Sequence, residues 1–93
     1  MKIQIDPHTL ERAEERGTDD AEIRDVIETG FSIAARGKRY GKAKIYDYGE
    51  SHGGRQYKQK RVEVIYVVED DKIVKVTVFV FYGEWEDADA SHL

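Results

Sequence analysis

The spacing of apolar residues changes once along the chain, at Gly30, and this change constrains the fold more than any other feature. Before it, apolar side chains such as Ile23 and Ile27 recur at helical intervals. After it, Phe31 and Ile33 alternate with polar residues, which is typical of strands. Helices therefore come first and strands follow. This segregation predicts an α+β fold rather than an alternating α/β fold.

The ends of two helices can be located from capping residues. Asp6 followed by Pro7 is typical of an N-cap and first helical position, and Gly17 of the left-handed residue after a helix. A second helix begins after Thr18 or Asp19, either of which can cap it, and ends at the glycine where the spacing changes. We expect helices over residues 7–16 and about 20–29.

The strands are expected to form one antiparallel sheet of three to four strands, with a short N-terminal strand and two helices on one face. Residues 61–68 are apolar on both sides, so we expect this strand to be central and covered on both faces. An Asp-Asp turn joins it to the last strand as a hairpin. Residues 49–59 read as a polar, glycine-rich loop. The expected strands are Lys2–Ile5, Phe31–Ala35, Ala43–Tyr48, Arg61–Val68 and Ile73–Tyr82, the last with Val74, Val76, Val78 and Val80 on one face.

Length and composition narrow the class of protein. Ninety-three residues suffice for one domain, 1–93, ending in an acidic and partly loose tail at 84–93. The chain has no cysteine, so disulfides and thiolate metal sites are excluded. The three histidines are scattered, and we expect neither a metal nor a cofactor. No segment is typical of a signal peptide or a membrane helix, which predicts a soluble, cytoplasmic protein without a membrane partner.

Charge is distributed unevenly. Residues 36–61 carry a net charge of +7 and the rest of the chain −11, although the whole chain is acidic at −4. A local potential of this kind favours an anionic partner such as RNA. The alternative is a solvated sheet edge whose lysines prevent pairing with other strands. The basic residues are Arg36, Lys38, Arg39, Lys42, Lys44, Arg55, Lys58, Lys60 and Arg61.

The first helix carries a stripe of basic residues. His8, Arg12 and Arg16 are spaced four apart and therefore share one face of the helix. Two arginines at this spacing destabilise a helix by roughly a few tenths of a kcal/mol, about as much as an oppositely charged pair would stabilise it. The stripe is either an anion site, because guanidinium groups bind phosphate bidentately, or a set of surface ion pairs with Glu15, Asp19 and Asp20.

Two further segments contain residues suited to chemistry. In Arg55–Arg61, basic residues interleave with Tyr57, and strand periodicity puts Lys60 on the face opposite to Arg61. Phosphate contacts and base stacking would suit such a surface to RNA, or it is simply a charged strand entry. Tyr82 lies at the end of the last strand. It either packs half-buried or transfers a proton, if neighbouring cations lower its pKa.

Taken together, these motifs resemble a known family. H-T-L-E-R-A-E-E-R-G-T, Y-K-Q-K-R-V-E-V-I-Y-V and V-T-V-F-V-F-Y-G-E-W look like a small bacterial and archaeal family known only as a domain of unknown function, with an H-x-x-x-R-x-x-x-R-G first helix. That family is similar to the RelE/ParE-like toxins. The resemblance covers Asp6–Trp85 and implies a curved antiparallel sheet. It also implies RNA or the ribosome as a target and a cognate antitoxin as a partner.

The main hypothesis is therefore a metal-independent endoribonuclease in which the RNA 2′-hydroxyl is the nucleophile. His8 or Tyr82 would move the protons, with acid and base left unassigned. Arginines and lysines would stabilise the charge that develops on the phosphorane: Arg12, Arg16, Lys58, Lys60 and Arg61. RNA would bind to Arg36, Lys38, Arg39, Lys42, Lys44, Arg55, Tyr57 and Lys58. The alternatives are a non-enzymatic binding module for nucleic acid or protein, and a structural domain whose His-Arg stripe pairs with its own acidic residues.

Overall fold

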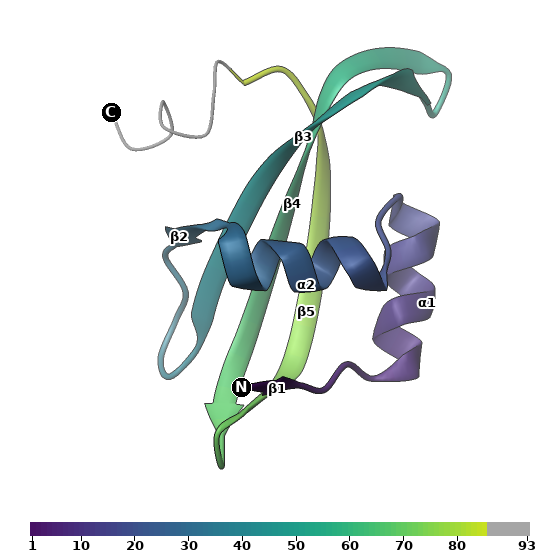
Figure 1. Cartoon of the computed structure of the whole chain (residues 1–93). Helices are drawn as coiled ribbons and strands as arrows, with labels where there is room; N and C mark the ends of the chain where they lie inside the picture. The colour runs from purple at the N-terminus through teal and green to yellow at the C-terminus, as the bar shows by residue number, and fades with distance from the viewer. Residues whose placement is uncertain (86–93) are drawn as a thin grey trace.

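Two helices and five strands form the part of the chain, residues 1–85, that the computed structural model describes (Figure 1). The sheet has the order β1-β5-β4-β3-β2, and only the β1–β5 pair is parallel. Both helices contribute to one core on the same face of the sheet. In chain order the elements are β1 (Lys2–Ile3), α1 (Pro7–Arg16), α2 (Asp20–Thr29), β2 (Phe31–Ile33), β3 (Tyr40–His52), β4 (Arg55–Glu69) and β5 (Lys72–Gly83).

The α+β class with two helices packed on a sheet is confirmed, but the sheet differs from the prediction. It has five strands and is mixed, not antiparallel with three to four strands. The mixed character comes from β1, whose Lys2 and Ile3 pair in parallel with Lys72 and Ile73. Local periodicity predicts a strand but not its direction relative to a partner seventy residues away. Of the predicted acidic tail at 84–93, only Glu84 and Trp85 are described, and residues 86–93 lie outside the described part of the chain.

The predicted helix ends are confirmed by the cap geometry. The Asp6 carboxylate accepts a hydrogen bond from the His8 amide at 2.7 Å, and Gly17 has a left-handed φ of 102°. Of the two candidate caps of α2, Asp19 fills the position and accepts from the Glu22 amide at 2.9 Å. The Thr18 hydroxyl instead donates to the Glu22 carboxylate at 2.7 Å. Both helices therefore begin with a carboxylate at the N-terminus, where it is favoured.

The predicted loop at 49–59 is wrong, because most of it belongs to two long strands. β3 and β4 continue to His52 and from Arg55, and only Gly53 and Gly54 form the turn. Both glycines have positive φ, 60° and 82°, which suits a two-residue hairpin turn. A bulge between Asp47 and Glu50 shifts the register within this hairpin. These polar residues extend the two strands because their backbones pair with each other across the hairpin, and this pairing does not require a buried apolar face.

A β-bulge at Lys75 changes which residues of β5 face the helices. Lys75 has a φ of 54°, and the register with β4 shifts between Ile65 and Val67. An extra residue in one strand reverses the alternation of side chains beyond it. Ile73, rather than the predicted Val74, is therefore buried with the core residues of the second half of β5. The predicted hairpin of the last two strands is confirmed.

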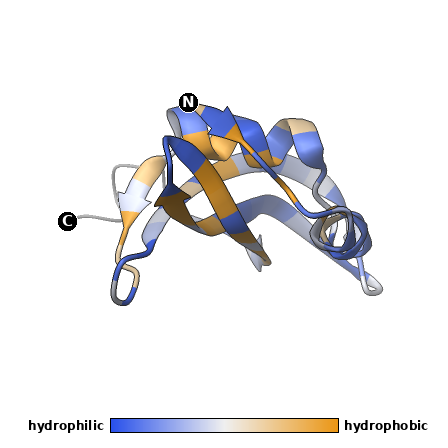
Figure 2. Cartoon of the chain, turned by 90° about the horizontal axis from the view of Figure 1, so that it is seen from below, coloured by the Kyte–Doolittle hydropathy of each residue, from blue (hydrophilic) through white to orange (hydrophobic). Residues whose placement is uncertain are grey.

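The core lies between the helices and one face of the sheet. Its largest fully buried side chains are Ile23 and Val26 of α2 and Val62 and Val64 of β4. The prediction that β4 is covered on both faces is wrong, because Ile65 on its other face is only half-buried and neither helix of the described part of the chain lies there. In Figure 2 hydrophobic residues are concentrated on the strands, whereas α1 is largely hydrophilic. Residues 1–85 thus place no covering layer on the second, largely apolar face of the sheet.

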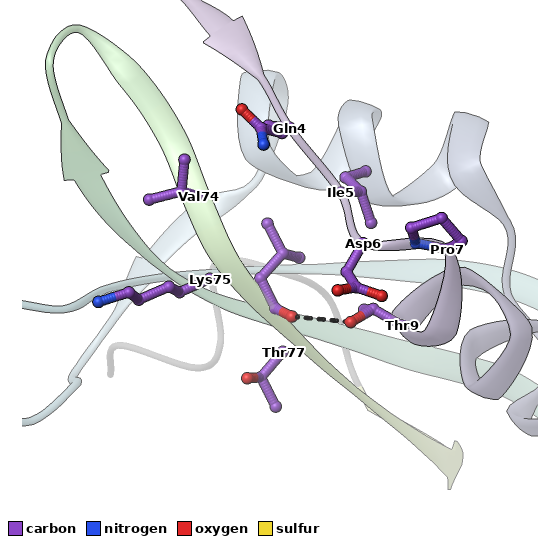
Figure 3. A pocket seen from close by; sticks show the side chains of 9 residues that line it. Gln4, Ile5, Asp6, Pro7, Thr9, Val74, Lys75 and Thr77 are labelled. Carbon is purple, nitrogen blue, oxygen red and sulfur yellow. Dashed lines mark hydrogen bonds between the residues drawn. The ribbon is translucent and has the colours of Figure 1, made fainter.

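Helix α1 lies beside the edge of β5. β1 ends after Ile3, so most of β5 has no neighbouring strand on that side. There, the Thr9 hydroxyl donates to the carbonyl of Val76 at 3.5 Å, the contact drawn in Figure 3. The Arg16 guanidinium donates to the carbonyl of Val78 at 2.7 Å. Two strand carbonyls that would otherwise pair with another strand are therefore bound by helix side chains.

Candidate nucleic-acid interface

The predicted stripe on α1 follows the edge of β5. Arg12 and Arg16 line a shallow hollow of about 100 Å³ together with residues 76–78 of the strand. His8 is exposed and lies 3.9 Å from the Glu11 carboxylate. Within residues 1–85, neither arginine forms the ion pairs considered above with Glu15, Asp19 or Asp20. Arg16 binds the carbonyl of Val78, so its position in the stripe has a structural explanation that needs no bound ligand.

His8 and Tyr82 lie at opposite ends of α1. The Tyr82 hydroxyl donates a hydrogen bond to the carbonyl of Arg16, in the last turn of the helix, whereas His8 is in the first turn. Eight residues at 1.5 Å per residue separate the two ends by about 12 Å. A proton donor and acceptor for one phosphate must both come within hydrogen-bond reach of it. The structure does not bring these two predicted catalytic residues together.

Tyr82 belongs to an aromatic cluster, which we define as Tyr48, His52, Tyr57 and Tyr82. Its ring stacks on His52 with 4.0 Å between ring centroids, and lies 5.1 Å from Tyr48 and 5.7 Å from Tyr57. Burial raises the pKa of Tyr82, and Tyr48 and Glu22 raise it further. The pKa of Tyr82 therefore shifts in the direction opposite to the lowering predicted for a catalytic tyrosine, mainly because burial disfavours the charged phenolate.

Lys60 and Arg61 are both held by carboxylates, and on opposite faces of β4. Lys60, only 8% exposed, places its Nζ 2.7 Å from the Glu22 carboxylate and 2.8 Å from the Gly17 carbonyl. Arg61 pairs through Nε with Glu63 at 2.8 Å, on the face without helices. Successive strand residues alternate between faces, as predicted for this pair. These two candidates therefore cannot meet at one phosphate.

Lys44 is also neutralised, in a network on α2. Its Nζ donates to Asp25 at 2.7 Å and to the Thr29 hydroxyl at 2.8 Å, and the Tyr46 hydroxyl donates to Asp25 at 2.6 Å. The hydrogen bond from Lys44, followed by those from Tyr46 and Thr29, lowers the pKa of Asp25 from 3.8 to about 2. Burial, followed by the bond to Asp25, raises the pKa of Tyr46. The carboxylate is thus kept charged and the phenol protonated.

The Asp25 network predicts a specific acid sensitivity. Because the pKa of Asp25 is lower in the folded chain than in the unfolded chain, its charge stabilises the fold above about pH 4. This contribution is lost as the pH falls from about 4 to about 2. We expect Asp25→Asn to flatten that part of the stability curve, measured by urea unfolding at several pH values. Asp47→Asn, at an exposed carboxylate, is the control and should keep the wild-type slope. Identical acid slopes in wild type and Asp25→Asn would contradict the assignment.

The remaining basic residues fall into two groups at opposite ends of β3. Arg55 and Lys58 lie at the β3–β4 hairpin, where they line a groove of about 500 Å³ with Tyr57 and Glu84. Lys58 pairs with Glu84 at 3.1 Å, whereas Arg55 forms no ion pair with any residue of 1–85. The other group, which we call the basic turn, lies around the β2–β3 connection and comprises Arg36, Lys38, Arg39 and Lys42. β3 is roughly 40 Å long at about 3.4 Å per residue, and the nearest members of the two groups, Lys42 and Lys58, are separated by about 20 Å along it.

The basic turn combines cations with an exposed aromatic ring. Within the described part of the chain, its four side chains form no ion pair. Arg39 turns back through Nε onto the carbonyl of Arg36 at 3.2 Å, and Lys42 donates to Ser32 at 3.2 Å. Tyr40, between them, is 56% exposed and stacks on Tyr66 with ring centroids 5.8 Å apart. Tyr40 was not among the predicted RNA-binding residues, although basic residues flank it in R-G-K-R-Y-G-K as they flank Tyr57 in its own segment.

The pocket drawn in Figure 3 contains none of the predicted site residues. It has a volume of about 550 Å³ and lies between the β1–α1 connection and the bulge of β5. The Asp6 carboxylate that borders it is occupied in capping α1.

Residues 1–85 contain no cluster of three or more metal-ligating side chains. Among these residues, no helix is long and apolar enough to cross a membrane.

Comparison with known proteins gives no family for this chain. No protein-family model, no curated protein and no solved structure matches it. The class defined by fold and site together is a small α+β domain with two helices on a mixed sheet and a cationic turn at one end.

Proposed function

We propose that the chain is a non-enzymatic RNA-binding domain that contacts phosphates through the basic turn. The observation that carries the proposal is that the four cations of the basic turn form no ion pair with any residue of 1–85, in a segment that also contains the exposed ring of Tyr40. Other cations of the +7 segment, including Lys44, Lys60 and Arg61, already have carboxylate partners. Among residues 1–85 the basic turn gathers four cations of this segment without ion pairs, against Arg55 alone at the hairpin, so an anionic ligand is attracted most strongly to the basic turn.

A single-stranded ligand fits the basic turn better than a duplex. Phosphate contacts by arginine and lysine supply affinity without sequence specificity. The exposed face of Tyr40 can in addition stack on an unpaired base, which is worth roughly 1–3 kcal/mol in single-stranded complexes. Bases inside an RNA duplex are already stacked on each other and present only their edges. We therefore assign single-stranded RNA as the ligand class.

The endoribonuclease alternative is less well supported by the geometry. Acid–base catalysis needs two proton-transfer groups near one phosphate, and His8 and Tyr82 are at opposite ends of α1. Lys60, proposed to stabilise the transition state, is buried against Glu22. Kinship with RelE/ParE-like toxins stays a proposal, supported by the H-x-x-x-R-x-x-x-R-G helix and by two helices on a sheet. A cognate antitoxin would follow from that kinship.

Binding is tested by fluorescence anisotropy with a labelled single-stranded RNA. With four phosphate contacts, we expect affinity to fall roughly 50-fold between about 50 and about 200 mM salt. The variant Arg36→Gln/Lys38→Gln/Arg39→Gln should lose at least about tenfold in affinity at the lower salt, since three of those contacts are removed. Its salt dependence should also become shallower, because fewer counterions are released.

A matched control and an activity assay separate the alternatives. The variant Arg55→Gln/Lys58→Gln removes two cations at the other end of β3 and should bind RNA like the wild type. A loss of binding in this variant but not in the basic-turn variant would move the interface to the hairpin. Incubation with cellular RNA, with and without ribosomes, should leave the RNA uncleaved. Products with 2′,3′-cyclic phosphate ends that disappear in Tyr82→Phe would instead support the nuclease.

A further inference from the structure

The sheet face opposite to the helices, which we call the outer face, forms an ordered array across four strands. Residues that pair directly across strands share a face, so the register defines three rows on it. Row one is Ile33, Gly41, Ile65 and Thr77; row two is Phe31, Ala43, Glu63 and Phe79; row three is Ile45, Arg61 and Phe81. Apolar side chains make up most of the array. Arg61 and Glu63 are its only charged members.

Two phenylalanines of the outer face are unusually exposed. Phe79 and Phe81 leave 42% and 47% of their surface in contact with solvent, side by side on β5. By contrast Ala43, which lies between Phe31 and Glu63 in row two, is fully buried, so the small side chain at this position is covered by its larger neighbours. A contiguous apolar patch of this kind on a small protein marks an interaction surface more often than an isolated exposed residue does.

The charged pair at the centre of the outer face is complementary to itself. Arg61 and Glu63 pair at 2.8 Å, and both side chains are largely shielded from solvent. The Arg61 guanidinium also lies 5.2 Å from the centre of the Phe31 ring. The two charges cancel, so the face does not repel a copy of itself. A two-fold rotation can bring Arg61 of one copy onto Glu63 of the other, and the reverse, in an isologous contact.

We propose that the outer face is the interface of a homodimer. Two copies pack sheet against sheet, burying Phe79 and Phe81 and exchanging the Arg61–Glu63 pair between chains. From strand and residue spacings, four strands and three rows cover roughly 400 Å². That is below the roughly 800 Å² per partner of standard interfaces, so the dimer is weak and forms at micromolar or higher concentration. The basic turn lies outside this array, and RNA binding does not depend on the dimer.

Self-association of the full chain is tested by sedimentation velocity between about 10 and about 500 μM. We expect the average mass to rise from 10.7 kDa towards twice that value. Phe79→Ser/Phe81→Ser should stay monomeric over this range, with its fold checked by circular dichroism. Tyr40→Ser removes an exposed aromatic ring outside the array and should dimerise like the wild type. A wild type that stays monomeric at the highest concentration overturns the proposal.

Charge reversal tests whether the occupant is a second copy of this chain. Arg61→Glu gives each face two negative charges and Glu63→Arg two positive charges, so each variant alone should stay monomeric. An equimolar mixture of the two should form a heterodimer, because opposite faces then meet. Dimers of either single variant as strong as those of the wild type, or no association in the mixture, would contradict the exchanged pair.

Discussion

Replacing Lys60 by alanine is expected to lower the free energy of unfolding by about 3 kcal/mol, in the range for breaking a buried ion pair. The ammonium group of Lys60 is almost fully buried and donates to Glu22 and to the carbonyl of Gly17. Its removal leaves a largely buried carboxylate without its counter-charge and a carbonyl without its donor. Urea unfolding followed by circular dichroism measures the change.

The same strand offers a matched control. Lys58, two residues away in β4, has an 82% exposed side chain, and Lys58→Ala should change the unfolding free energy by less than about 0.5 kcal/mol. Glu22→Gln combined with Lys60→Ala should cost less than the sum of the two single variants, because both remove one interaction. If Lys60→Ala unfolds at the same urea concentration as Lys58→Ala, the structural role of Lys60 is wrong.

The second large effect is expected at Gly17, where α1 ends. Gly17 has a φ of 102°, and a Cβ there would lie 2.0 Å from the Tyr82 hydroxyl oxygen. Gly17→Ala therefore adds a steric clash to the backbone strain, and we expect it to lower the unfolding free energy by about 2–3 kcal/mol. Gly37→Ala is the control for strain alone, since Gly37 has a φ of 64° and no atom within 4 Å of its Cβ position. It should cost about 1 kcal/mol.

A second variant separates the clash from the strain. Tyr82→Phe removes the hydroxyl group that the new methyl group would meet, together with its hydrogen bond to Arg16. In the Tyr82→Phe background, Gly17→Ala should therefore destabilise the chain by less than it does in the wild type. An equal cost in both backgrounds would mean that the tyrosine hydroxyl does not limit substitution at this position.

Elements encoded by neighbouring residues could be predicted from the sequence. Asp6, Pro7 and Gly17 define α1 because capping depends on residues a few positions apart. The hairpin of β4 and β5 follows in the same way from two apolar segments around Asp70 and Asp71. The lengths of β3 and β4 could not be predicted, because their polar residues carry no buried-face pattern and are ordered by pairing with each other.

Whether a charged residue is paired with an opposite charge depends on contacts between residues that are distant in the sequence. Lys60 meets Glu22 across 38 residues and Lys44 meets Asp25 across 19, so no local pattern indicated that either lysine was neutralised. The face of Ile73 could not be predicted either, because the bulge at Lys75 reverses the alternation. Alternation did correctly separate Lys60 from Arg61, and this separation divides the predicted catalytic set between two faces of the sheet.

The contact of α1 with β5 has a consequence for aggregation. An uncovered strand edge is a template on which strands of other molecules can add, as in cross-β fibres. Along β5 the carbonyls of Val76 and Val78 are already bound by Thr9 and Arg16, so an incoming chain finds no free acceptor at these two positions. Thr9 and Arg16 on α1 thus protect this edge of β5 against the addition of further strands, independently of any ligand.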